Sequence, residues 1–315
     1  NMHLFEDVDF PEPETLFDDY ATRGPQMKTQ ELTIDRHMGY AFDFKVRELK
    51  NEPTLQYIRD SWLMAMAEMD SEQRATWEAI YDKKNEEFLK NPPVGKDLLR
   101  WKYQRYVKEY CRTIRSVDEQ VGRLLDYLEE KGVLDNTVIV YTSDQGFLLG
   151  EHGLYDKRFM YEESFRTPLI ISCPSLVKKH SVCKELVQNI DLAPTFLSLA
   201  GVEVPKEMSG RSLLPLFKNG KAENWRNELY YHFYDYPAVG SVRKHDGIRT
   251  KRYKLIHWYG EGSGNDEAID FWELYDLKKD VMEVNNVYDN PKYVKVREAL
   301  TVQLEKLRKD VGVTE

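Results

Sequence analysis

Residues 137–146 read TVIVYTSDQG, a short β-branched run that stops abruptly at polar side chains. A continuous apolar run of this length is typical of a strand buried on both faces of a sheet. A similar run, Thr167–Ser172, follows a loop that contains glycines. Apolar residues at three-and-four spacing predict a long helix before the first strand, from about 98 to 131, and a shorter helix follows the second strand at 193–200. The order helix, strand, loop, strand, helix predicts an α/β sheet that is largely parallel.

The chain outside this region shows three further patterns. Prolines interrupt residues 1–30, which we expect to be irregular. Residues 54–90 predict one or two amphipathic helices, with Ser71 as a helix N-cap. Beyond Trp225, short apolar runs separated by turns predict an antiparallel sheet, followed by an amphipathic helix over Val294–Val311.

These patterns predict two units. Residues 1–220 belong to an α/β unit with a partial mixed or parallel sheet flanked by helices. Residues 221–315 form a smaller antiparallel β subdomain with a terminal helix.

Composition narrows the class of protein. The 315 residues carry a net charge of −9, which argues against nucleic acid as a partner but allows a small anionic substrate in a local positive pocket. No apolar run approaches the roughly 18 residues of a membrane span, and no apolar leader opens the chain. Of the three cysteines, Cys173 and Cys183 could pair across a loop, and the odd count leaves the redox compartment open.

The polar residues after the first strand are the strongest candidates for chemistry. Ligands of open α/β sheets bind beyond the carboxyl ends of the strands, where Asp144 and Gln145 lie. A carboxylate and an amide oxygen are hard ligands suited to Ca²⁺ or Mg²⁺. The alternative is that Asp144 caps the next turn and Gln145 is a solvated loop residue.

Two further residues in the following loop could act on an anion. Lys157 could present a point charge beside the metal, or could be an ordinary surface lysine. His152 could donate a proton, or could be a simple loop histidine.

A set of ordered motifs adds to this interpretation. Residues 142–153 read TSDQGFLLGEHG, and DKR and EESFRTPL follow at 156–158 and 162–169. This region closely resembles the second signature region of the type I sulfatases. Other motifs of that family occur in the same order over about residues 100–315, at 135–137, 189–195, 209–213, 247–256 and 272–277.

The resemblance implies an alkaline-phosphatase-like fold and a Ca²⁺ ion held by acidic and amide side chains. Asp144 and Gln145 match the second pair of metal ligands, although asparagine is commoner at the latter position. Lys157 matches the lysine that contacts the sulfate and assists the leaving oxygen, and His152 is our candidate for the proton donor. The implied product is the free alcohol of a sulfated carbohydrate.

The family's nucleophile, a formylglycine made in a C/S-x-P/A-x-R motif, has no counterpart that we accept. Cys111–Arg115 has threonine in place of Pro or Ala, and Ser172–Leu176 lacks the arginine. Asp18–Asp19 superficially matches the family's first metal-binding pair, but no apolar strand precedes it. We therefore expect the chain to lack the N-terminal half of the catalytic domain. That half would be its partner, and these residues would be inactive and poorly stable alone because sheet edges stay uncovered.

A final resemblance concerns the substrate. The stretch from Tyr234–Pro237 through 243–249 resembles that of sulfatases acting on 6-sulfated N-acetylglucosamine, in glycosaminoglycans or mucin. Arg243 and His245 are the predicted specificity residues, while the tyrosines could instead pack the sheet. Such an enzyme would be periplasmic, secreted or lysosome-like. The alternatives are a phosphodiesterase or phosphonate-ester hydrolase of the alkaline phosphatase superfamily, or a non-catalytic module that binds sulfated glycans.

Overall fold

The computed structural model describes residues 1–46 and 56–313. Both strands predicted around the polar loop are present, as β1 (Ile139–Thr142) and β4 (Leu169–Ser172). They pair with each other, Thr142 opposite Leu169, and they run antiparallel. The predicted parallel arrangement is therefore wrong for this pair. The reason is that the connecting chain contains no crossover helix but doubles back through the short pair β2 (Leu148–Leu149) and β3 (Tyr155–Asp156).

The first part of the chain is helical after an irregular start. The described helices are α1 (Gln26–Thr29), α2 (Gln56–Glu68), α3 (Ser71–Lys90) and α4 (Gly95–Glu130). Residues 54 and 55 of the predicted helix lie outside the described residues. The predicted N-cap at Ser71 is wrong by one position, because Asp70 accepts from the backbone N–H groups of Glu72 and Gln73 in a capping box.

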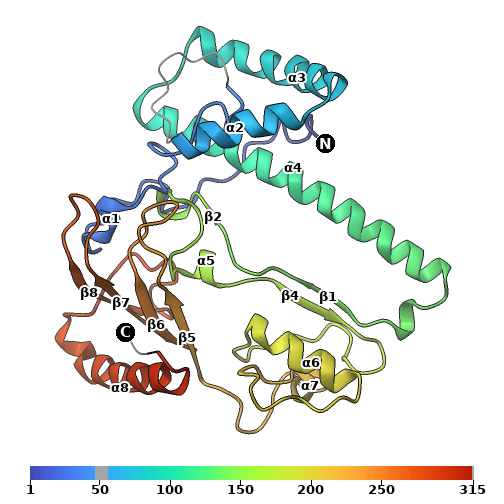
Figure 1. Ribbon diagram of the computed structural model, residues 1–315, viewed down its shortest axis with the longest axis vertical. Helices are drawn as coiled ribbons and strands as arrows, with labels where there is room; N and C mark the ends of the chain where they lie inside the picture. Colours follow the sequence, from blue (N-terminus) through green and yellow to red (C-terminus); the bar gives the residue numbers. More distant parts are fainter. Residues whose placement is uncertain (47–55, 314–315) are drawn as a thin grey trace.

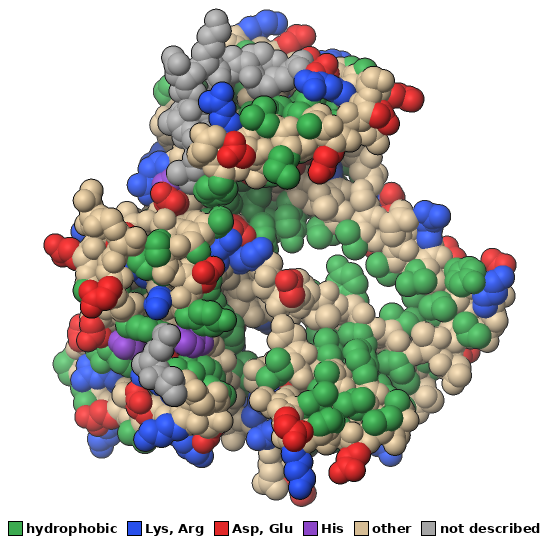
Figure 2. Space-filling model, in the orientation of Figure 1, with side chains coloured by type: hydrophobic (Ala, Val, Ile, Leu, Met, Phe, Trp, Pro, Cys, Tyr) green, Lys and Arg blue, Asp and Glu red, His purple; other side chains and the backbone are tan. Residues whose placement is uncertain are grey.

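The apolar stripe of α4 is only half covered. Val107 is buried, but Ile114 and Leu124 further along the same helix are 42% and 57% exposed. Figure 1 shows this half of α4 extending away from the C-terminal sheet, above β1 and β4. Exposed apolar residues also lie on these strands, and Figure 2 shows apolar side chains gathered at the surface there. We call this surface the open apolar face; it comprises Ile114, Val117, Leu124, Tyr127, Tyr141 and Ile170.

The C-terminal part forms the predicted antiparallel sheet. Its strands lie in the order β5 (Glu228–Phe233), β6 (His245–Thr250), β7 (Tyr253–Gly260) and β8 (Ile269–Asp276). The predicted terminal helix, α8 (Val294–Asp310), packs Leu300 and Leu304 against one face. The other face shares a core with earlier chain, in which residues such as Phe159 and Tyr161 lie in one cluster with Trp258. The boundary at 220/221 stays a prediction, since this core crosses it.

A loop-rich segment between the two parts is held by one buried ion pair. It contains α6 (Leu192–Leu199) and α7 (Leu214–Phe217), and the short helix α5 (Glu162–Phe165) precedes β4. Asp191 is fully buried; it binds Arg226 through both carboxylate oxygens and accepts from the backbone N–H of Arg211 at 2.8 Å. The single-turn 3₁₀ helices are Leu134–Asn136, Glu151–Gly153, Asn189–Asp191 and Pro291–Tyr293.

The structure bears on two expectations from composition, a cysteine pair and a membrane span. All three cysteines are free, Cys173 being buried and Cys183 exposed, so these two do not pair. Within the described residues, no helix combines the length and the apolar character needed to cross a membrane.

A second buried ion cluster joins α5 to the C-terminal sheet. The Lys254 ammonium group is fully buried, 2.9 Å from a carboxylate oxygen of Glu162 and 2.7 Å from one of Glu283. Glu162 also pairs with Arg249 at 3.0 Å. Burial alone would raise the pKa of Glu162, but Lys254 and Arg249 outweigh it and lower this pKa to about 2. Burial dominates at Glu283, whose pKa rises to about 6. We call these four residues the Lys254 cluster.

The Glu162 carboxyl makes a testable contribution to stability. Its folded-state pKa lies below its ordinary value of 4.5, so its contribution is full above pH 4.5 and disappears as the pH falls towards 2. We expect Glu162→Gln to lower the free energy of unfolding by up to about 3 kcal/mol at pH 7, and by progressively less below pH 4.5. Urea unfolding at several pH values measures this. The exposed acid variant Glu130→Gln serves as control and should differ from wild type by less than about 0.5 kcal/mol throughout. A difference for Glu162→Gln that does not change with pH would contradict the assignment.

Candidate active site

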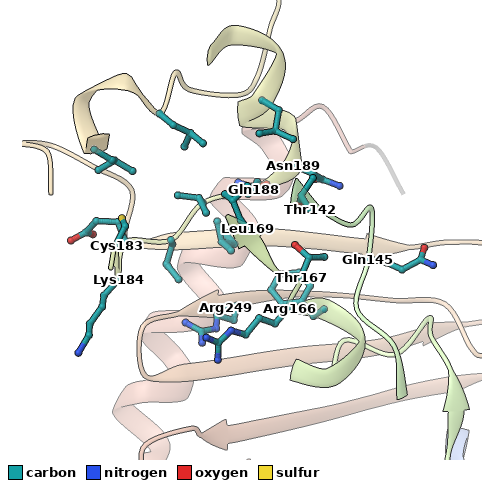
Figure 3. A pocket seen from close by; sticks show the side chains of 18 of the residues that line it. Thr142, Gln145, Arg166, Thr167, Leu169, Cys183, Lys184, Gln188, Asn189 and Arg249 are labelled. Carbon is teal, nitrogen blue, oxygen red and sulfur yellow. The ribbon is translucent and has the colours of Figure 1, made fainter. Parts of the chain in front are cut away.

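A cleft of about 1240 Å³ opens between the β1–β4 pair, the segment 181–189 and the edge strand β5. Figure 3 shows side chains of the β1–β4 region and of the segment 183–189 around it, together with Arg249 of β6. The lining is cationic: six basic side chains face three acidic ones. The basic residues are Lys157, Arg158, Arg166, Lys184, Arg249 and Lys251, and the acidic ones are Asp144, Glu162 and Glu185.

Three of the predicted site residues meet at one end of this cleft. With its amide oriented to suit both neighbours, Gln145 donates to Asp144 Oδ2 at 3.2 Å and accepts from Lys157 Nζ at 3.0 Å. The side chain of Asn189 supports them by donating to the Asp144 carbonyl at 3.1 Å. The loop through β2 and β3 thus returns Lys157 to the end of β1. Their roles as metal and sulfate ligands remain predictions.

Gly146 explains how the chain makes this turn. Its N–H donates to the Ser164 carbonyl at 2.8 Å. A β-carbon at this position would lie 2.1 Å from the carbonyl oxygen of Glu163 and 2.8 Å from that of Arg166. Only glycine therefore lets the loop after β1 lie directly against the segment before β4.

Replacing this glycine tests the contact. We expect Gly146→Ala to destabilise the protein by ~2 kcal/mol, because the methyl group must displace backbone rather than a movable side chain. Gly122→Ala is the matched control: nothing lies within 4 Å of its added methyl group, and alanine favours the helix there by about 0.5–1 kcal/mol. Chemical unfolding of both variants provides the measurement. Equal stabilities would show that the loop does not need this close approach.

The residues present fit part of a metal site. Asp144 and Gln145 both carry hard oxygens. Turning the Gln145 amide oxygen towards Asp144 Oδ2, 3.2 Å away, would bring oxygens of both residues together as around a shared cation, in exchange for the hydrogen bond from Lys157. Calcium takes six to eight oxygen ligands. In the described part of the chain, no group of three or more His, Cys, Asp or Glu residues could hold a metal. The pair therefore matches the two ligands that the resemblance implies, but the two residues do not form a complete metal site.

The structure places His152 away from this constellation. Its side chain is buried, with Nδ1 2.8 Å from a carboxylate oxygen of Asp18, and it does not line the cleft. Arg23 completes the group by pairing with the same oxygen of Asp18 at 3.2 Å. Here Asp18, which resembled a metal ligand, binds a histidine and an arginine. The catalytic role of His152 stays a prediction that its position does not support.

Arg243 and His245 are also outside the cleft lining. Arg243 is buried and donates to backbone carbonyls, including that of Glu267 at 2.8 Å. The His245 ring stacks on Trp258 with 4.1 Å between ring centres, and burial lowers the pKa of His245 to about 4. Both side chains stabilise the interior of the β subdomain, so the structure does not bring them to the other three residues.

Sequence reasoning missed several cleft residues. Arg166, Asn189 and Arg249 all line the cleft, and each belongs to a motif region given above, at 162–169, 189–195 or 247–256. The signal was therefore present, but residue type and spacing alone did not separate a side chain that faces the cleft from one that faces the core.

Comparison with known proteins now identifies the family. A sulfatase family model matches residues 11–202, and a model described as N-sulphoglucosamine sulphohydrolase, C-terminal, matches 150–310. The chain belongs to the sulfatase family, with its alkaline-phosphatase-like fold, and this family generally uses a divalent metal. The match extends well before residue 100, where the resemblance by motifs began.

Three individual proteins are similar to this chain over different lengths. The chain is 45% identical over 311 residues to an N-acetylglucosamine-6-O-sulfatase of Bacteroides thetaiotaomicron, covering 98% of this chain and 54% of the relative. A solved complex of a protein with its substrate, D-glucosamine-2-N,6-O-disulfate, matches with a TM-score of 0.87 and 44% identity, over 97% of this chain and 60% of the other. The multifunctional alkaline phosphatase superfamily protein PehA of Trinickia caryophylli is 35% identical over 196 residues, 58% of this chain and 36% of that protein. The chain thus spans about half the length of the first of these relatives.

Proposed function

We propose that this chain forms part of a sulfuric ester hydrolase that removes the 6-O-sulfate from N-acetylglucosamine or a related glucosamine in a sulfated glycan. The observation that carries the proposal is the contact of Asp144, Gln145 and Lys157 at one end of a cationic cleft. Two relatives support the choice of sugar: one is named for 6-O-sulfated N-acetylglucosamine, and the other was solved with a 6-O-sulfated glucosamine.

We propose the following roles for the residues at hand. Asp144 and Gln145 would hold a divalent metal, which we propose to be Ca²⁺ because both donors are hard oxygens; when bound, it would neutralise negative charge on the sulfuryl oxygens. Lys157 adds a fixed positive charge beside it, which stabilises the sulfuryl group as the bond from sulfur to the sugar oxygen breaks. Asn189 keeps Asp144 in place through the Asp144 carbonyl. We propose a periplasmic, secreted or lysosome-like location for this activity.

We propose that other polypeptide supplies the remaining groups. Our sequence interpretation accepts no nucleophile motif in these residues, and in the described part of the chain no group of three or more His, Cys, Asp or Glu residues could hold the metal. We propose that the open apolar face packs against the N-terminal half of the catalytic domain, which carries these groups. The exposed Ile114, Leu124 and Ile170 support this proposal, because extended apolar surfaces commonly mark packing partners.

A second candidate function has one observation in its favour. It is the hydrolysis of phosphate or phosphonate esters in the same cleft, since those anions carry the same kind of oxygens; the identity to PehA, which is named a multifunctional protein of the alkaline phosphatase superfamily, is in keeping with it. The non-catalytic binding alternative receives no comparable support.

Substrate turnover tests the proposed activity. We expect the enzyme that contains this chain to release sulfate from N-acetylglucosamine 6-sulfate faster than from 2-O-, 4-O- or N-sulfated sugars, and faster than it cleaves phosphonate esters. Lys157→Gln should lower kcat by about 100-fold or more, because it removes a charge aimed at the reacting group. Lys278→Gln, an exposed lysine outside the cleft, is the control and should keep normal turnover. Preference for a phosphonate ester would support the second candidate instead.

Metal binding gives an independent test. Asp144→Ala should weaken calorimetric binding of Ca²⁺ by at least about tenfold, since ligand charge sets the affinity of such sites. The control Asp135→Ala removes an exposed carboxylate that does not line the cleft, and should bind like wild type. Unchanged Ca²⁺ affinity in Asp144→Ala would refute the metal assignment.

A further inference from the structure

The loop that presents Lys157 has a strained backbone on both sides of this residue. Asp156 and Arg158 have φ angles of +68° and +91°, in the left-handed region that residues with a β-carbon rarely adopt. Such conformations persist only where surrounding contacts enforce them. The Asp156 carboxylate binds the Arg158 guanidinium group, but this ion pair lies within the loop and does not attach it to another element.

The nearest backbone anchors lie one step further out along the chain. Before the loop, the N–H of Tyr155 donates to the Leu32 carbonyl at 2.9 Å. After it, Phe159 is fully buried in the core that the β subdomain shares with earlier chain. These contacts fix where the loop begins and ends, and the path between them decides where the Lys157 ammonium group lies.

One hydrogen bond attaches this path to the β subdomain. The hydroxyl of Tyr231 donates to the carbonyl of Arg158, the residue directly after Lys157, at 2.9 Å. Tyr231 belongs to β5, the edge strand of the C-terminal sheet, and its side chain lines the cleft (Figure 1). It lies outside the motif regions that relate the chain to its family. A residue of the smaller subdomain thus contacts the loop at its strained turn.

The ring of Tyr231 is itself held in place from two sides. Phe165 of α5 meets it edge-on, and His245 of β6 lies beside it, each with 5.5 Å between ring centres. Phe165 also lies against the Lys254 ammonium group, 5.8 Å from its ring centre, and so joins this support to the Lys254 cluster. Burial raises the pKa of Tyr231, so its hydroxyl keeps its proton and remains a donor.

We propose that Tyr231 is a positioning residue for the reaction. Its hydroxyl holds the Arg158 carbonyl, and thereby keeps Lys157 Nζ at the reacting end of the cleft, 3.0 Å from the Gln145 amide oxygen. This inference rests on the proposed function. A charge stabilises a transition state best when it is fixed in place before the reaction. Without the hydroxyl, the strained turn relaxes and the ammonium group loses its alignment.

A single hydroxyl group can be removed to test this role. Tyr231→Phe keeps the ring, and water in the cleft can replace the hydroxyl at the Arg158 carbonyl, so the fold is retained. In the enzyme that contains this chain, acting on N-acetylglucosamine 6-sulfate, we expect kcat to fall about tenfold. KM should change by less than about twofold, because misplacing Lys157 affects the transition state more than the bound substrate.

Tyr293→Phe is the matched control. It removes a hydroxyl that donates to Asp276 at 3.1 Å in the same subdomain, outside the cleft lining. It should keep both kinetic constants, and thermal unfolding shows that both variants are folded.

A double variant tests whether Tyr231 acts through the lysine. If it does, adding Tyr231→Phe to Lys157→Gln should lower kcat by less than about a further twofold, since the group being positioned is already absent. If the two losses multiply, Tyr231 acts in another way and the inference is wrong.

Amide hydrogen exchange tests the anchoring without turnover. We expect residues 155–159 to exchange at least about tenfold faster in Tyr231→Phe than in wild type, and at the wild-type rate in Tyr293→Phe. Unchanged exchange in Tyr231→Phe overturns the inference and leaves the proposed function intact. If the wild-type enzyme releases sulfate from none of the sugars named above, the proposed function fails, and the exchange rates alone decide whether Tyr231 holds the loop.

Discussion

The buried charge of Lys254 is the constraint on which the two parts of this molecule depend. An ammonium group in the interior must be paired, and its carboxylate partners come from α5 on one side and from the chain after β8 on the other. Removing one partner of a buried ion pair typically costs about 3–5 kcal/mol, because the remaining charge is left uncompensated. The cluster therefore fixes the position of α5, and with it the start of the segment that leads through Arg166 into β4.

The cleft owes its shape to this anchoring. One wall is tied down by the Lys254 cluster, and the opposite wall by the buried pair of Asp191 and Arg226. Between them, the loop after β1 lies against backbone rather than side chains. The Lys254 cluster, the pair of Asp191 and Arg226, and one glycine thus position side chains that are far apart in the sequence. The shared core around Trp258 holds the β subdomain against the same region.

Much of this architecture could be predicted from the sequence, for identifiable reasons. The strands β1 and β4 follow from continuous apolar runs, and the C-terminal sheet follows from short runs between turns. The contact of Asp144, Gln145 and Lys157 was anticipated because they belong to a family motif. The direction of β4 relative to β1 was not predicted correctly. Strand direction depends on how the connecting chain returns, and a parallel and an antiparallel strand can have the same apolar pattern.

The direction in which individual side chains point was the second feature that could not be predicted from the sequence. Arg243 and His245 looked available because they are polar, yet one satisfies backbone carbonyls and the other stacks on Trp258. The stripe on α4 predicted a buried face correctly only as far as Val107, because a periodic pattern shows that a face is apolar but does not show what covers it.

The contact at Gly146 also bears on how freely this site can vary. Because its neighbours there are main-chain atoms, which every amino acid carries, the path of the loop does not depend on the identity of the adjoining side chains. Position 145 lies beside this contact: the resemblance to the family implies asparagine as the commoner residue there, and the longer glutamine side chain reaches both Asp144 and Lys157. The backbone path therefore restricts position 146 to glycine, whereas position 145 is restricted by the contacts and the metal binding proposed for its side chain.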